Sequence, residues 1–187
     1  MVTNDYDTTF YCERGIKMIR EAIEKDLLDI LEIYNDAILN TTSVYDYKAH
    51  TIHDREHWYE KKKQEGYPIL VYVQNYKVLG FATFAPFRAW PAYKYSVEHS
   101  IYVHKRYRNK GIGMLLAKEI IRIVNEREFA TIVAGIDDAN EKSIKMHEKL
   151  GFKYSGTINK VGYKFGKWLN LAFYQLELKG PKNPIDG

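Results

Sequence analysis

The sequence has only one cysteine, Cys12, and 5 prolines among its 187 residues. A single thiol cannot form a disulfide within the chain, so a fold stapled by internal disulfides is excluded. A signal-peptide pattern is also missing, and so is any run of about 18 apolar residues of the kind that crosses a membrane. These absences lead us to expect a cytoplasmic protein without membrane contacts.

Neither sign of charge dominates the composition. The chain has 28 Lys and Arg against 24 Asp and Glu, which gives a formal net charge of +4. Because the charges are evenly spread and form no basic stripe, we expect no nucleic-acid partner. The small positive excess is compatible with an anionic small-molecule ligand.

The length and the hydrophobic content of 45% are enough for one sizeable core and give little reason for two domains. Residues 1–17 have no convincing period and form an extension whose role the pattern does not assign. We expect one domain over residues 18–179, followed by a frayed tail over residues 180–187.

Hydrophobic periodicity predicts an alternation of helices and strands along the domain. Helical spacing occurs over residues 26–38 and after Gly111, and more polar helices are predicted over 53–65 and after a capping-box pattern at 138–141. Strand patterns occur at residues 18–22, 69–74, 78–84, 93–103, 131–136, 154–164 and 168–178. This order predicts an α/β (α+β) fold with about six to seven strands and about four helices.

The segment from Arg108 to Gly113 reads Arg-Asn-Lys-Gly-Ile-Gly, a basic turn with two glycines before an amphipathic helix. Unpaired backbone N–H groups at a helix start can bind a pyrophosphate, and glycine lets the phosphate approach the backbone. The turn lacks the Gly-Lys-Ser/Thr ending of a nucleoside triphosphate loop and the third glycine of a dinucleotide fold. Glycines before a helix can also be simple punctuation, and this turn alone does not decide between the two.

A second pattern runs from Asn140 to Phe152 and reads Asn-Glu-Lys-Ser-Ile-Lys-Met-His-Glu-Lys-Leu-Gly-Phe. Together with the glycine turn, it resembles the GCN5-related N-acetyltransferase (GNAT) superfamily. Further matches at Val97–Val103 and Gly162–Trp168 place the resemblance in the branch of phosphinothricin and methionine sulfoximine acetyltransferases. The resemblance covers most of the chain.

The resemblance implies the GNAT fold, in which one strand of a mixed central sheet splays from its neighbour and holds acetyl-CoA. It implies acetyl-CoA as co-substrate and no metal. The strand backbone would pair with the pantetheine arm, and the glycine turn would receive the pyrophosphate. For the two basic side chains of the turn, a solvated surface role is the alternative. The implied cofactor-binding residues are Ile101, Tyr102, Val103, Arg108, Lys110, Gly111, Ile112, Gly113, Met114, Asn140 and Ser143.

Acetylation of an amine by a thioester needs a base for the amine and a proton for the departing thiolate. Alternation along its strand puts Glu98 on the same face as Ser100 and Tyr102, and partial burial would raise its pKa and make it a better base. An edge-exposed glutamate is the alternative, and the resemblance favours the base. His147 shares a helix face with Ser143 and could return a proton or hydrogen-bond the pantetheine, although a lone histidine on an apolar helix face is often a core residue.

Candidate acceptor-binding residues lie before the catalytic strand and after the first helix. Arg88 and Tyr93 suit a carboxylate, phosphinate or sulfoximine, because a guanidinium pairs with oxyanions. Trp90 stands where phosphinothricin-specific relatives tend to carry an arginine, so other small amino acids stay open as acceptors. Thr42 lies where superfamily members close the acceptor pocket, but loop polarity explains it equally well.

We therefore expect an acetyl-CoA-dependent N-acetyltransferase that acetylates a small amino acid or analogue by direct transfer in a ternary complex, and we expect a homodimer. A protein or peptide N-acetyltransferase is the main alternative, since the cofactor half does not distinguish acceptors. A non-catalytic acetyl-CoA-binding module is another. His53, Glu56 and His57 match a reversed zinc-peptidase pattern, which would imply a zinc hydrolase. The chemistry of the Gly162–Trp168 signature does not follow from its pattern.

Overall fold

The structure, a computed structural model, describes residues 17–186. Residues 1–16 of the expected extension, including Cys12, lie outside the described part. The described residues form seven strands and four α-helices, which confirms the predicted fold class. The strands are β1 (Lys17–Glu21), β2 (Ile69–Gln74), β3 (Lys77–Pro86), β4 (Ser96–Val103), β5 (Thr131–Asp137), β6 (Lys153–Lys164) and β7 (Lys167–Glu177). The helices are α1 (Leu27–Asn40), α2 (Ile52–Gln64), α3 (Ile112–Glu126) and α4 (Glu141–Lys149).

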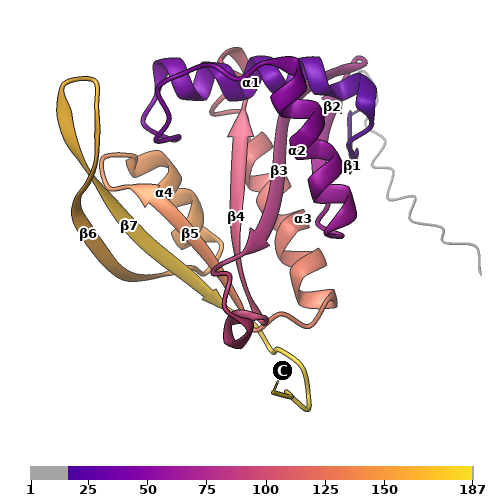
Figure 1. Cartoon of the computed structure of the whole chain (residues 1–187), viewed down its shortest axis with the longest axis vertical. Coiled ribbons are helices and arrows are strands. Elements are labelled where there is room, and N and C mark those ends of the chain that lie inside the picture. The colour runs from indigo at the N-terminus through magenta and orange to yellow at the C-terminus, as the bar shows by residue number, and fades with distance from the viewer. Residues whose placement is uncertain (1–16, 187) are drawn as a thin grey trace, which may run out of the picture.

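All strands belong to one sheet with the order β1-β2-β3-β4-β5-β7-β6. Neighbouring strands are antiparallel except β4 and β5, which are parallel. In Figure 1, β6 and β7 form a long hairpin that extends away from the rest of the sheet on the side of α4. The parallel pair therefore lies in the middle of the molecule, between the antiparallel N-terminal half and the C-terminal hairpin.

Helices cover both faces of the sheet, as their apolar stripes predict. The buried residues of α1 recur at helical spacing and pack with β2 and β3 on one face. The stripe of α3 packs with β3, β4 and β5 on the other face, where the core also includes Phe152 after α4. The buried residues of α3 are Ile112, Leu116, Ala117, Ile120 and Val124.

The parallel pair β4–β5 opens along its length. Its paired residues run only from Ser96 to Glu98 on β4, whereas the pairing of β4 with β3 continues to Val103. The N–H of Phe87 donates to Ser96 O, and the N–H of His104, the residue after β4, donates to Leu79 O, so the even-numbered residues direct their backbone groups toward β3. Successive residues of a strand alternate between its edges, and the odd-numbered residues after Glu98 therefore point their N–H groups into the opening.

Two local expectations were wrong in detail. The strand predicted from residue 93 begins at Ser96, because Pro91–Tyr93 form a 3-10 turn after Trp90. The cap of α4 is Asn140, whose side-chain oxygen accepts from the N–H of Ser143, and not the start of the 138–141 pattern. Asp138 instead accepts a hydrogen bond from Asn170 on β7 and ties the start of α4 to the hairpin.

Candidate active site

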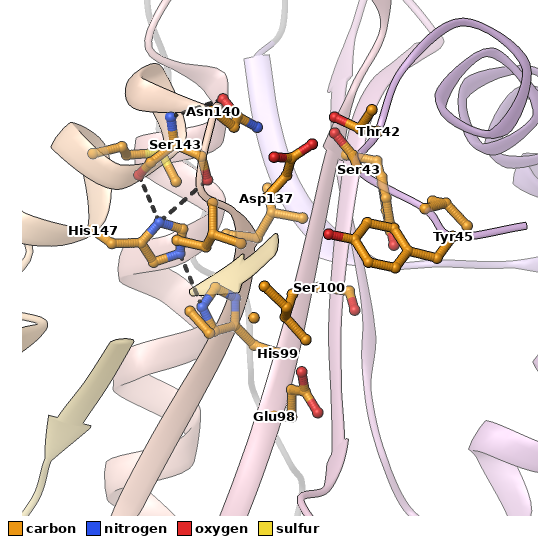
Figure 2. A pocket seen from close by; sticks show the side chains of 18 residues that line it. Thr42, Ser43, Tyr45, Glu98, His99, Ser100, Asp137, Asn140, Ser143 and His147 are labelled. Carbon is orange, nitrogen blue, oxygen red and sulfur yellow. Dashed lines mark hydrogen bonds between the residues drawn. The ribbon is translucent and has the colours of Figure 1, made fainter. Parts of the chain in front are cut away.

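The opening between β4 and β5 contains a cavity of about 380 Å³. Side chains from five places in the sequence line it: β4, β5, α4 with its cap, β7 and the segment after α1 (Figure 2). Three cavity-lining residues on β4 are polar, namely Glu98, His99 and Ser100. The divergence of the two strands therefore brings titratable groups from both faces of the sheet to one place.

Glu98 lies at the last paired position of β4, where the opening begins. No bulge interrupts the β3–β4 register, so Glu98 shares a face with Ser100 and Tyr102 as predicted. A side chain at Gly135 on β5 would have its Cβ 2.9 Å from Glu98 Oε1, so the glycine leaves the space that the carboxylate occupies. Partial burial raises the pKa of Glu98, and the charge of Arg88 opposes this rise. The result is a carboxylate with increased proton affinity inside the cavity.

His147 and His99 form a buried pair across the opening. His147 Nδ1 lies 2.7 Å from Ser143 O, and His147 Nε2 lies 3.1 Å from His99 Nε2. A carbonyl oxygen only accepts, so His147 carries its proton on Nδ1 and its Nε2 accepts from the N–H of His99. Burial lowers the pKa of both rings, that of His99 to about 3 with a further contribution from His147. Both imidazoles are therefore neutral near pH 7.

A larger groove of about 1040 Å³ runs from the opening to the start of α3. Gly111 caps α3 in a left-handed conformation with φ of 83°, which favours glycine. Gly113 faces α4, since a Cβ there would meet Met146 Sδ at 3.3 Å. The side chain of Ile112 is buried in the core, so only its backbone can face the groove. The first N–H groups of α3 have no acceptor within the helix and suit an anion at this end of the groove.

The other candidate cofactor residues differ in whether they line this groove. Met114, Asn140 and Ser143 line it, and the side-chain N–H groups of Asn140 stay available because its oxygen caps α4. Arg108 also lines it, although its guanidinium already binds Asp36 Oδ2 at 2.7 Å and Val103 O at 3.1 Å. Lys110 does not line the groove, and its ammonium lies 4.8 Å from the ring centre of Tyr107.

Lys164 holds the segment after α1 against both cavities. Its ammonium donates to three backbone oxygens, of Ile38 at 2.5 Å, Thr41 at 2.9 Å and Val44 at 2.6 Å. These carbonyls include the end of α1, where helix C=O groups lack internal partners. The contact explains the lysine of the Gly162–Trp168 signature, whose role the sequence pattern left open.

Comparisons with known proteins agree with this geometry. The model of the "Acetyltransferase (GNAT) family" matches residues 27–152. The chain belongs to this family. It is 39% identical over 160 residues, 86% of this chain and 94% of the relative, to L-methionine sulfoximine/L-methionine sulfone acetyltransferase of Salmonella typhimurium.

Solved structures of GNAT proteins have the same fold. The crystal structure of an N-acetyltransferase from Staphylococcus aureus Mu50 is 54% identical, with a TM-score of 0.87 over 87% of this chain and 99% of that one. A phosphinothricin acetyltransferase from Sinorhizobium meliloti in complex with acetyl-CoA is 32% identical, with a TM-score of 0.86 over 90% of this chain and 92% of that one. The open β4–β5 pair described above is therefore a feature of a chain with the fold of these GNAT proteins.

The candidate acceptor residues of this GNAT chain are only partly gathered at the cavity. Thr42 lines both the cavity and the groove, from the segment that Lys164 holds. Arg88, Trp90 and Tyr93 lie outside the residues that line either space and are exposed. Arg88 stacks on Phe87, and its charge still acts on Glu98. Of these three residues, only Arg88 is linked to the cavity, through its charge on Glu98.

Sequence reasoning missed two buried polar residues at or beside the cavity of this GNAT chain. Asp137, the last residue of β5, lines the cavity opposite the segment after α1 (Figure 2), and its Oδ2 atom is buried without a hydrogen-bond partner among residues 17–186. Arg55 on α2 is buried beside Tyr102 in a neighbouring cavity. The position of Asp137 at a strand end was a usable signal, whereas nothing in the polar pattern of α2 marks Arg55 as buried.

The zinc-peptidase pattern does not form a metal site in the described part of the chain. His53 Nδ1 lies 3.0 Å from Glu56 Oε2, and both side chains are largely exposed. Across residues 17–186, no group of three His, Cys, Asp or Glu side chains comes together as metal ligands do. Within the same range, no helix is long and apolar enough to cross a membrane.

Proposed function

We propose that the protein transfers the acetyl group of acetyl-CoA to the amine of a small amino acid, with Glu98 as the base. The observation that carries this proposal is the position of a partly buried carboxylate where β4 and β5 separate. An acetylation reaction needs the amine in its neutral form, and a carboxylate of raised pKa accepts its proton more readily.

The residues around the groove fit the coenzyme. The unpaired N–H groups at the start of α3 suit its pyrophosphate, and the N–H groups of Ile101 and Val103 face the opening where the pantetheine arm would lie. The S. meliloti relative was solved with acetyl-CoA. When bound, acetyl-CoA supplies the activated acyl group, and backbone N–H groups of β4 would stabilise charge on the carbonyl oxygen.

His147 has a supporting role in this proposal. Both of its ring nitrogens are occupied and its ring is neutral, so it holds no spare proton for a thiolate. Ser143 Oγ lies 3.4 Å from His147 Nδ1 and lines both the cavity and the groove. We assign His147 to positioning this hydroxyl, which would hydrogen-bond the pantetheine arm or the sulfur of the departing thiolate.

A small amino acid is the favoured acceptor. The relative from S. typhimurium is named for methionine sulfoximine and methionine sulfone, and it matches 86% of this chain. Arg88 packs on Phe87, as Tyr93 does, and supplies a guanidinium whose charge reaches Glu98 and suits a carboxylate. Because Trp90 stands where phosphinothricin-specific relatives tend to carry an arginine, we expect phosphinothricin to be a poorer acceptor than methionine sulfone.

A thiol-release assay tests the proposed function. Acetyl-CoA is incubated with methionine sulfone, methionine sulfoximine, phosphinothricin, the free amino acids and a panel of peptides. We expect turnover with the first two at the highest kcat/KM. Turnover of peptides in preference to every free amino acid would replace the proposal by a peptide acetyltransferase. Saturable acetyl-CoA binding without turnover of any amine would favour the alternative that the protein is a non-catalytic acetyl-CoA-binding module.

We further propose that the protein is a cytoplasmic homodimer. The β6–β7 hairpin supports the dimer, because it carries a set of large exposed apolar side chains, more than isolated surface residues explain. They are Tyr154, Ile158, Val161, Tyr163, Phe165 and Trp168. Light scattering during gel filtration should give twice the mass of the chain, and a monomer at micromolar concentration would reject this part of the proposal.

A further inference from the structure

A second cavity, of about 360 Å³, lies next to the catalytic one on the α2 side of β4. The two cavities share Ser100 and Tyr102, which occupy the same face of β4 as Glu98. The wall facing β4 is formed by Tyr34 of α1 together with Arg55 and Trp58 of α2. This second space is therefore continuous in its lining with the site where the acceptor amine would lie.

Among the described residues that line this space, Arg55 is the only arginine or lysine, and most of its neighbours there are aromatic. Only 3% of the residue is exposed, and its guanidinium carbon lies 4.2 Å from the Tyr34 ring centre and 4.5 Å from that of Trp58. One of its terminal nitrogens, Nη2, donates to His50 Nδ1 at 2.8 Å. The proton of His50 therefore sits on Nε2, which faces Asp46 at 3.2 Å. Packing and one hydrogen bond fix the guanidinium in place.

The charge of Arg55 has no anion in contact with it. Between residues 17 and 186, no carboxylate lies within salt-bridge distance of its guanidinium, and its Nε has no hydrogen-bond partner. Loss of solvent lowers the pKa of this guanidinium, and the Tyr34 hydroxyl and the charge of Asp54, which also lines the cavity, oppose this only in part. A buried cation is costly unless oxygen acceptors satisfy its donors. A ligand with oxygen atoms would supply what the chain itself does not.

We propose that this cavity receives the oxygen-bearing side-chain end of the acceptor amino acid, a sulfone, a sulfoximine or a similar tetrahedral group, with Arg55 as its hydrogen-bond donor. The proposal rests on the proposed function and adds the residue that selects the side chain. A guanidinium is suited to it because its planar set of N–H groups can reach two oxygens at once.

The positions of the two arginines decide which end of the acceptor each one takes. In an α-amino acid the carboxylate is attached to the carbon that carries the amine, so it stays beside the base. Arg88 is the cation whose charge acts on Glu98, and it suits the carboxylate. Arg55 borders Ser100 and Tyr102 instead, and Ser100 is about 7 Å along the strand from Glu98. The side chain of the acceptor spans that distance, whereas its carboxylate does not.

The aromatic walls complete the match to such a side chain. The rings of Tyr34, Phe81 and Tyr102 pack against one another around the cavity, and Tyr34 meets Tyr102 edge to face with their centroids 5.2 Å apart. These rings offer apolar surface for the methylene and methyl groups that flank a sulfone. The cavity thus combines apolar contacts with one charged donor, as selective small-molecule sites do.

The test compares two acceptors that differ only in the side-chain oxygens, methionine sulfone and methionine. In Arg55→Met we expect kcat/KM for methionine sulfone to fall by about 10- to 100-fold, since bonds to a charged donor are lost. The value for methionine should change by less than about 3-fold. Arg55→Lys keeps the charge and should restore part of the preference. Equal losses for both acceptors in Arg55→Met and Arg55→Lys would overturn the proposal.

Two controls separate a binding role from a structural one. Arg122→Met removes an exposed arginine of α3 that binds Glu119 and Glu126, and it should leave both kcat/KM values unchanged. Calorimetry with acetyl-CoA reports whether each variant keeps its coenzyme groove. If Arg55→Met does not fold, the kcat/KM values for methionine sulfone and methionine are compared in Arg55→Lys alone.

A separate measurement decides the proposal if the wild-type protein acetylates no amino acid, which would refute the proposed function. Methanesulfonate, a tetrahedral oxyanion, is titrated while tryptophan emission is followed, because Trp58 lies against Arg55. Saturable quenching that is lost in both Arg55→Met and Trp58→Phe would support an oxyanion site. Absence of saturable quenching in the wild type would overturn it.

Discussion

His99 and His147 face each other across the opening of the sheet with their Nε2 atoms 3.1 Å apart. Because Ser143 O fixes the proton of His147 on Nδ1, the bond between the rings uses the N–H of His99. The remaining nitrogen of His99, Nδ1, is buried without a partner within residues 17–186. The pair is thereby committed to its neutral state, since a second proton would have to be buried in an apolar setting.

This arrangement predicts a loss of stability in mild acid. The pKa of His99 is lowered from 6.5 to about 3, so the folded state resists a proton that the unfolded chain accepts. Stability from this group is complete above pH 6.5 and is lost as the pH falls toward 3. By pH 5 the loss should be about 2 kcal/mol. Thermal unfolding of wild type and His99→Gln between pH 7 and pH 5 measures it, because glutamine keeps the N–H donor without titrating. Parallel pH dependence in the two proteins would contradict the account.

Glu98→Gln should lower kcat by about 10²-fold or more, because glutamine cannot accept the proton of the amine. Acetyl-CoA affinity, measured by calorimetry, should stay near the wild-type value. Unchanged turnover would remove Glu98 from the role of base.

The same substitution should stabilise the fold at neutral pH. Burial raises the pKa of Glu98, so the folded state favours the protonated form, and ionisation destabilises it as the pH rises through that pKa. The gain should be at most about 1 kcal/mol, since Glu98 is only partly buried. Thermal melts at pH 8 and pH 4 test the sign: the difference between the proteins should be present at pH 8 and vanish at pH 4.

Lys164→Met should loosen the segment after α1. Three backbone carbonyls lose their donor, so we expect a loss of about 1–3 kcal/mol in the free energy of unfolding. The KM values for acetyl-CoA and for the acceptor should both rise, because the segment lines both cavities. Lys153→Met, at an exposed position of β6, is the matched control. Unaltered KM values in a destabilised Lys164→Met protein would show that the lysine contributes to the stability of the fold and not to substrate binding.

Two glycines of the phosphate turn should respond differently to substitution. Gly111→Ala has free space around its Cβ but a positive φ, so it should cost about 1 kcal/mol of stability with little effect on catalysis. Gly113→Val puts methyl groups between α3 and Met146 at the groove, and we expect the KM for acetyl-CoA to rise about 10-fold. Chemical denaturation and steady-state kinetics on both variants separate the two effects. Equal behaviour of the two variants would speak against the groove as the coenzyme site.

Sequence patterns predicted the parts of the molecule in which local chemistry decides the structure. The apolar stripes of α1 and α3 and the alternation along β4 are local, so the helices, the face of Glu98 and the glycine turn were predicted correctly. The family pattern added the opening between β4 and β5, which no local rule contains.

Long-range contacts made by buried charged residues were not predictable in this way. The buried side chains of α2 are Arg55 and Lys62, so the helix has no apolar stripe to mark its inner face. Lys62 donates to Phe84 O and Lys164 to the segment after α1, over separations that only the fold brings together. A sequence pattern that takes every charged residue to be exposed places Arg55, Lys62 and Lys164 in solvent. Their partners are backbone oxygens and aromatic rings, which carry no complementary charge in the sequence.

The central claim is that the opening between β4 and β5 binds acetyl-CoA beside a carboxylate that takes the proton of the acceptor. Calorimetric titration of the folded protein with acetyl-CoA, followed by methionine sulfone in the presence of coenzyme A, tests it most directly. The account predicts saturable binding of acetyl-CoA at one site per chain, equal in wild type and Glu98→Gln and weaker in Gly113→Val. Folded protein that takes up no acetyl-CoA, or that binds it equally well in Gly113→Val, would contradict the account.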